Sequence, residues 1–171
     1  MSREWESYNV GRHLYLSKSC LESGLDDALV GTCFDEISRS LTQLDIHIES
    51  LSLTEADKID EFLFDRLSEK EVAVLSLGVA VGMIQSILLS MGPKNGSIPK
   101  STQGKLMGTI DLALDRIRMV SSEIDIQEIA RPLVEHIQPL LGDFSKLKAS
   151  GALLLSEIQT FEIQLKMRFE N

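Results

Sequence analysis

Apolar side chains recur along most of this chain at steps of three and four residues, which is the spacing of an amphipathic α-helix. No segment shows the strict alternation of apolar and polar residues, bounded by turn dipeptides, that is typical of β-strands. The sequence therefore predicts an all-α protein. Helices are expected over about 5–21, 30–51, 54–67, 72–91, 101–120, 125–141 and 144–169.

One predicted helix differs from the rest, because residues 72–91 contain no charged side chain. Ser68 and Glu71 before it have the spacing of a capping box, and Gly92 followed by Pro93 is a helix stop. A helix that is apolar on every side fits the middle of a bundle. We therefore expect one domain, spanning residues 1–171, in which about six or seven helices surround the central helix 72–91.

Several residues mark expected breaks in the helices. The segment 92–104 is rich in Gly, Pro, Ser and Lys and predicts a mobile loop. Pro132 and Pro139 predict a kink or a break into two short pieces, because proline has no backbone N–H to donate. Asp125 is expected to cap the helix that follows it, and Gly151 predicts a close helix contact or a bend.

The helix 72–91 is also long enough to cross a bilayer. Gly78 and Gly82 have the small-xxx-small spacing of helices that associate in membranes. Gln85 and three serines interrupt the apolar run, and the chain holds many amphipathic helices that need a shared core. We therefore expect a buried core helix, and a membrane-inserting helical protein that uses 72–91 stays as an alternative.

Charge is distributed unevenly along the chain. Residues 1–71 hold 16 acidic and 7 basic residues, a net charge of −9, whereas residues 72–171 hold 10 of each. An acidic surface repels a phosphate backbone, and this disfavours nucleic acid as the main partner. It favours a partner protein that has a basic surface.

The residues with metal-binding or redox chemistry are few and scattered. Cys20 and Cys33 both fall on apolar helical positions, and no signal peptide begins the chain, so we expect reduced, buried cysteines and a cytoplasmic protein. His13, His47 and His136 have no second histidine one helical turn away. No metal and no cofactor are expected.

One short motif is similar to a catalytic pattern. Arg131 and His136 form an Arg-x4-His pattern, which is similar to that of the HEPN ribonucleases, helical proteins in which an arginine and a histidine from two protomers act on RNA. The resemblance covers six residues and departs from the family at Pro132, where a polar residue is common. It implies an alternative function as an HEPN-like ribonuclease, with Arg131 and His136 as its catalytic residues.

The main expectation is a non-catalytic module of the immunity-protein, antitoxin, chaperone or inhibitor kind that acts by occupying a protein partner. An acidic face steers association with a basic surface without any catalytic group. The near-heptad apolar residues of 144–169 predict a second interface, through which the chain forms a homodimer if one bundle cannot cover them all. The candidate acidic contacts are Asp26, Asp27, Asp35, Glu36, Glu49, Asp57, Asp60 and Glu61.

Overall fold

A computed structural model describes residues 2–22, 27–46, 63, 65–91 and 98–170, leaving aside the side chains of 18–22 and 27–30. This part of the chain contains seven α-helices, one 3₁₀ helix and no strand, which confirms the all-α prediction. The predicted helix 54–67 lies outside the described residues, apart from its last few positions. The elements are α1 (Arg3–Glu22), α2 (Asp27–Gln43), α4 (Glu69–Ser90), α5 (Lys100–Glu123), α6 (Gln127–Ile137), η1 (Gln138–Gly142), α7 (Phe144–Ala149) and α8 (Gly151–Glu170).

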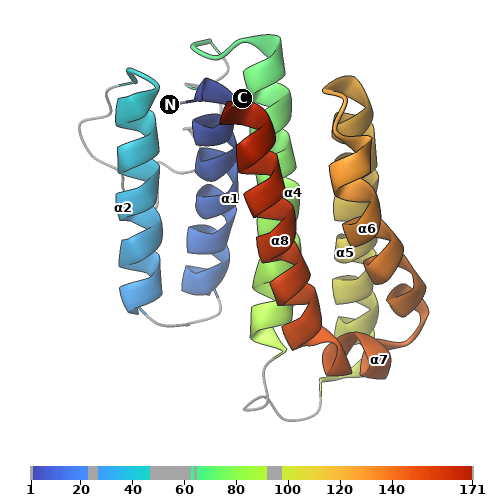
Figure 1. Ribbon diagram of the computed structural model, residues 1–171. Coiled ribbons are helices and arrows are strands. Elements are labelled where there is room, and N and C mark those ends of the chain that lie inside the picture. Colours follow the sequence, from blue (N-terminus) through green and yellow to red (C-terminus); the bar gives the residue numbers. More distant parts are fainter. Residues whose placement is uncertain (1, 23–26, 47–62, 64, 92–97, 171) are drawn as a thin grey trace.

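The helices form a bundle around α4, as predicted (Figure 1). On one side α1 packs against α4 and α2 packs against α1, and on the other side α5 packs against α4 and α6 packs against α5. Helix α8 closes the bundle by contacting α4, α1 and α6. Two hydrophobic clusters meet at α4, because Leu75 belongs to the cluster beneath α2 and Leu77 to the one beneath α5, α6 and α8.

The start of α4 is the predicted capping box. The Ser68 side chain accepts from the backbone N–H of Glu71 at 3.2 Å, and the Glu71 side chain accepts from the backbone N–H of Ser68 at 3.0 Å. Within the described residues, α4 is one helix that is long and apolar enough to cross a membrane, and 67% of its most apolar stretch is buried in the bundle.

Glycines bring α1 and α4 into backbone contact. A Cβ atom at Gly78 would collide with the carbonyl oxygen of Tyr8, and one at Gly11 would collide with the carbonyl oxygen of Leu75. A Cβ atom at Gly82 would lie 2.7 Å from the carbonyl oxygen of Arg12. The small-xxx-small spacing of α4 is therefore used inside the bundle, where it seats α1.

Two aspartates end helices in the left-handed conformation. Asp45 (φ 60°) follows α2, where the N–H of Ile46 donates to the carbonyl of Leu41 at 2.9 Å. Asp125 (φ 57°) follows α5 in the same way, with the N–H of Ile126 donating to Ser121 at 2.9 Å. These bonds are those of Schellman motifs. The expectation that Asp125 caps the next helix was wrong, because Ile126 occupies that position without a side-chain cap.

Other boundaries also differ from the sequence analysis. Helix α5 begins at Lys100, so residues 100–104 are helical, although the predicted loop 92–104 included them and overlapped the predicted helix 101–120. The Gln103 side chain donates to the Ile98 carbonyl at 2.8 Å and holds this first turn. The rest of that loop, 92–97, lies outside the described residues. The predicted last helix divides at Ser150, so Gly151 begins α8 with no close neighbour. Pro139 lies in η1, which ends α6 as predicted.

Candidate functional site

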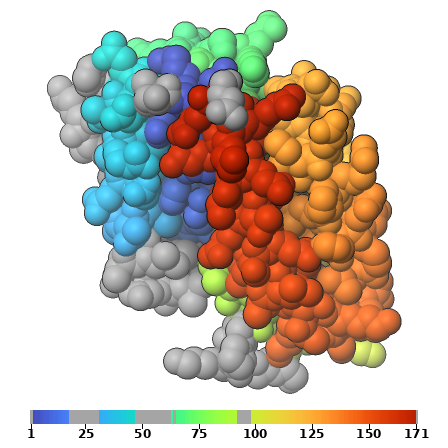
Figure 2. Space-filling view, in the orientation of Figure 1, coloured from blue at the N-terminus to red at the C-terminus, as the bar shows by residue number. Residues whose placement is uncertain are grey.

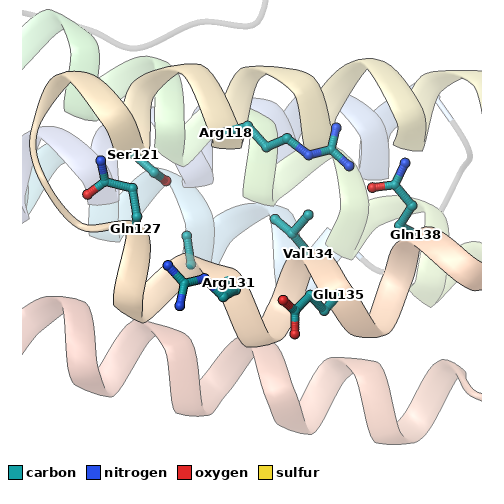
Figure 3. A pocket seen from close by; sticks show the side chains of 8 residues that line it. Arg118, Ser121, Gln127, Arg131, Val134, Glu135 and Gln138 are labelled. Atoms are coloured by element: carbon teal, nitrogen blue, oxygen red, sulfur yellow. The ribbon is translucent and has the colours of Figure 1, made fainter.

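One candidate binding site is a groove between α5 and α6. These two helices run antiparallel and are joined by a tight turn at residues 124–126. Side chains from both helices therefore line one concave surface between them (Figure 3). The groove has a volume of about 410 Å³, which is in the range of small-molecule sites. Its lining residues are Arg118, Ser121, Gln127, Ala130, Arg131, Val134, Glu135 and Gln138.

Polar groups lie at both ends of this groove, with an apolar stretch between them. Ser121, Gln127 and Arg131 lie toward the turn (Figure 3). Arg118 and Gln138 lie toward the other end, and Val134 lies between the two groups. A ligand that fits the groove would therefore be elongated, with an apolar body and a polar end.

The two arginines of the groove differ in their partners. Arg118 donates to Asp115 one turn away at 2.7 Å, in an exposed pair on α5. Arg131 is exposed and has no hydrogen bond or ion pair with any described residue. Glu135, one turn further along α6, also lines the groove and is not paired with Arg131. Arg131 is therefore the cation of the groove that is free to bind an anion.

Ser121 adds a buried polar atom to the groove. Ser121 is 2% exposed, and its hydroxyl has no hydrogen-bond partner among the residues that the structure describes. The helical serines Ser86 and Ser90 behave differently, because each donates to the carbonyl three residues earlier, at 2.9 and 2.8 Å. A buried hydroxyl without a partner has lost its hydrogen bonds to water and gained nothing in return.

A second, smaller pocket of about 190 Å³ lies between α6 and α8 and contains the other predicted catalytic residue. His136 places its Nδ1 atom 2.6 Å from an Oε1 atom of Glu157 on α8. Arg131 lines the groove on the other side of α6. Within one chain the structure therefore does not bring Arg131 and His136 together.

The sequence analysis missed a buried polar network that joins α1, α4 and α8. Tyr8 donates to the carboxylate of Glu162 at 3.0 Å, and Arg12 donates to the same oxygen at 2.7 Å. The Nε of Arg12 also donates to Gln85 on α4 at 3.0 Å. Burial, and then the nearby Glu162, raises the pKa of Tyr8 well above its usual value. Burial also raises the pKa of Glu162, although Arg12 and Tyr8 act in the opposite direction.

This network is structural, because its hydrogen bonds join α8 to α1 and α1 to α4 within the bundle. Two signals in the sequence point to it. Gln85 is an amide within an otherwise apolar stretch, and Glu162 lies beside the near-heptad position Phe161.

The structure describes the side chains of two of the predicted acidic contacts. Asp35 is exposed on α2, and Glu36 accepts from Arg39 at 2.7 Å, a hydrogen bond that lowers the pKa of Glu36. Asp27 begins α2, but its side chain is not described. The other five lie outside the described residues: Asp26, Glu49, Asp57, Asp60 and Glu61.

Of the residues with metal-binding chemistry, Cys33 is buried in α2 and His13 is buried in α1, where its Nδ1 lies 2.8 Å from the carbonyl oxygen of Asn9. No group of three or more histidines, cysteines and carboxylates that could hold a metal occurs in the described ranges.

Comparison with protein-family models, with curated proteins and with solved structures found no match for this chain. The candidate sites therefore rest on the geometry of this chain itself.

Proposed function

We propose that the protein is a non-catalytic protein-binding module, that the outward face of α8 is its contact surface, and that a second copy of the chain is the partner. The observation that carries the proposal is the exposure of three large apolar side chains on this helix. Leu153, Ile163 and Met167 are between 61% and 63% exposed. Apolar side chains gathered on one exposed face are typical of interaction surfaces.

The three residues share one side of α8. The helix buries Leu154, Ile158 and Leu165 against the bundle. Residues 153, 156, 160, 163 and 167 follow steps of three and four on the opposite side, and none of them is charged. Figure 2 shows that α8 lies uncovered along the visible face of the molecule. The apolar surface of α8 is thus wider than its own bundle covers, which is the condition for the predicted homodimer through 144–169.

Charge supports a second copy as the partner. The whole chain has a net charge of −9, and residues 1–71 account for that excess. Two copies that met through their acidic halves would repel each other. Two copies that met through the uncharged face of α8 would bring Leu153 of one chain near Met167 of the other across a two-fold axis at Thr160.

The acidic residues predicted from the sequence do not carry this proposal. Asp35 is exposed and Glu36 is already paired with Arg39, and the side chains of the other six predicted contacts are not described. The ribonuclease alternative stays a prediction: Arg131 and His136 line separate pockets of one chain, and the resemblance implies an arginine and a histidine from two protomers.

Sedimentation velocity at a series of protein concentrations tests the proposal. We expect a concentration-dependent dimer, and we expect Ile163→Glu to make the protein monomeric because it places a charge in the centre of the contact. The matched control is Leu112→Glu, which changes an equally exposed residue (68%) on α5, away from the face. Circular dichroism of both variants checks that the helices persist.

Two results would overturn the proposal. One is a wild-type protein that stays monomeric up to millimolar concentration, which would leave a different protein as the occupant. The other is a dimer that Ile163→Glu leaves intact, which would place the contact elsewhere.

A further inference from the structure

We propose that the groove between α5 and α6 binds a small organic anion, a carboxylate or phosphate ester with an apolar body, and that Arg131 and Ser121 hold its anionic group. This site shares no residue with the outward face of α8 and does not depend on the function proposed above.

The first step of the argument is the position of Arg131. Its guanidinium group lies at the end of the groove toward the α5–α6 turn, on the same side as Ser121 and Gln127 (Figure 3). A guanidinium offers a planar pair of donors that matches a carboxylate or a phosphate. Because no described carboxylate is paired with Arg131, an anion would not have to displace a partner.

The second step is the unpartnered hydroxyl of Ser121. This residue is 2% exposed and lines the same groove, so its oxygen is already removed from water in the free protein. A ligand oxygen that accepts from this hydroxyl recovers a hydrogen bond without any new desolvation of the protein. Ser121 is therefore a groove-lining donor whose hydroxyl has no partner among the described residues of the free protein.

The third step is the middle of the groove. Val134 lies between the Arg131 end and the end at Arg118 and Gln138 (Figure 3), and Ala130 is the other apolar residue that lines the groove. A volume of about 410 Å³ exceeds what an inorganic anion needs. The apolar stretch therefore selects an anion that carries an apolar body, which would cover Val134.

One residue of the groove opposes an anion. Glu135 lines the groove one turn from Arg131, and its carboxylate lowers the positive potential there. Asp115 has the same effect on Arg118, with which it is paired. Asp115 therefore disfavours an anionic group at the Arg118 end, and Glu135 gives the proposal a prediction of opposite sign.

The test uses the full chain and four probes, followed by the backbone amide signals of α5 and α6 in NMR titrations. The probes are phenyl phosphate, benzoate, inorganic phosphate and uncharged benzyl alcohol. We expect saturable shifts around residues 118–138 with phenyl phosphate or benzoate, at dissociation constants of about 1 mM or below. Inorganic phosphate and benzyl alcohol should bind about tenfold more weakly, because each lacks one of the two recognised features.

Substitutions then assign the contacts. Arg131→Met should weaken the affinity for the tighter-binding probe by about tenfold or more, since it removes a charge-assisted pair. Its control is Arg116→Met, an exposed arginine of α5 outside the groove, which should leave binding unchanged. Glu135→Gln should strengthen binding by about threefold, because it removes the opposing charge.

Ser121→Ala separates a ligand contact from a structural role. The free protein should keep or raise its melting temperature, because a buried hydroxyl without a partner is removed, while affinity for the probe falls by about fivefold. The control is Ser40→Ala on α2, whose hydroxyl is also buried and unpartnered but lies outside the groove. It should have the same effect on stability and none on affinity.

The proposal fails if no probe gives saturable shifts in α5 and α6 up to about 10 mM. It also fails if Arg131→Met and Ser121→Ala both leave the affinity of the bound probe unchanged, or if benzyl alcohol binds as well as the anions.

Discussion

The two sides of α4 are built by different means. Toward α1, the contact is backbone against backbone at Gly11, Gly78 and Gly82, and the buried network of Arg12 and Glu162 adds to it. Toward the C-terminal helices, α5 and α6 meet through side chains and leave an open groove beside their turn. The α1 side therefore has little room for any change, whereas the α5–α6 side has space for a ligand.

This difference separates the residues that hold the fold from those that are available for binding. On the α1 side each residue of the network makes a hydrogen bond, and each of the three glycines has a close neighbour. On the α5–α6 side, Arg131 and the Ser121 hydroxyl have no partner within the described part of the chain. Substitutions should consequently cost stability on one side and change binding on the other.

The largest effect is expected at Gly78. Gly78→Ala places a methyl group against the Tyr8 carbonyl, so α1 must move, and we expect a loss of about 3 kcal/mol in the free energy of unfolding. Gly108→Ala on α5 is the control, because a Cβ atom there has no neighbour within 4 Å. It should stabilise the protein by about 0.5–1 kcal/mol, the gain in helix propensity. Urea unfolding of both variants checks the comparison, and equal effects at the two glycines would contradict it.

The next effect comes from an ion pair. Arg12→Met removes the partner of the buried Glu162 carboxylate, and it should lower the free energy of unfolding by about 3 kcal/mol. Adding Glu162→Leu to the same chain should restore much of this loss, because no unpaired charge then stays buried. The pair of Arg118 and Asp115 has the same length, 2.7 Å, but is exposed. Arg118→Met should therefore cost under about 1 kcal/mol. A double-mutant cycle for each pair measures the difference, and similar coupling energies would show that burial does not distinguish the two pairs.

A smaller effect is expected at the start of α4. Ser68→Ala removes one half of the capping box that fixes this helix beside α1, at a cost of about 1 kcal/mol. The first turn of α5 follows Pro99 and has no side-chain cap, so Ser101→Ala there should be nearly neutral. Thermal unfolding of the two variants provides the check, and a neutral Ser68→Ala would show that the cap adds nothing to the packing of α4.

The smallest effect concerns pH. Burial, and then the charge of Arg12, lowers the pKa of His13 from its usual 6.5, so the unfolded chain binds a proton at this residue more readily than the folded one. The stability that neutral His13 contributes is present above pH 6.5 and is lost as the pH falls below it.

His13→Gln should therefore reduce the loss of stability between pH 7.5 and pH 5.5 in urea unfolding. Glu162 acts in the opposite sense, since its raised pKa favours the folded state as the pH falls, but it is present in both proteins and cancels in the comparison. An unchanged pH dependence in His13→Gln would contradict the assignment to His13.

The α-helical fold and its centre could be predicted because they depend on local signals. The uncharged run 72–91 and the Ser68 cap identify α4, and apolar periodicity identifies the other described helices. The prediction of helix boundaries failed where one local signal is compatible with two structures. Asp125 has the residue type of a helix cap, but it takes the left-handed position that ends α5 instead. The turn at Ser150 divides one apolar pattern into α7 and α8 without interrupting it.

The sites were less predictable, because they depend on which helices become neighbours. Ser121 is an ordinary helical serine in the sequence, and only the fold shows that it is buried and lines the same groove as Arg131. Arg131 was singled out for its spacing from His136, yet the helix places these two residues in different pockets. The exposed face of α8 was partly predictable, since its near-heptad pattern includes more apolar residues than one contact surface requires.

The glycine contact between α1 and α4 also has a consequence during synthesis. Gly11 and Leu75 are 64 positions apart in the chain, so at about 5–20 residues per second the partner surface of α1 follows it by roughly 3–13 s. Glu162, which completes the polar network around Tyr8, is translated later still, 154 positions after Tyr8. Helix α1 therefore leaves the ribosome before α4 and α8, and the apolar surface that it buries against them stays uncovered until they follow.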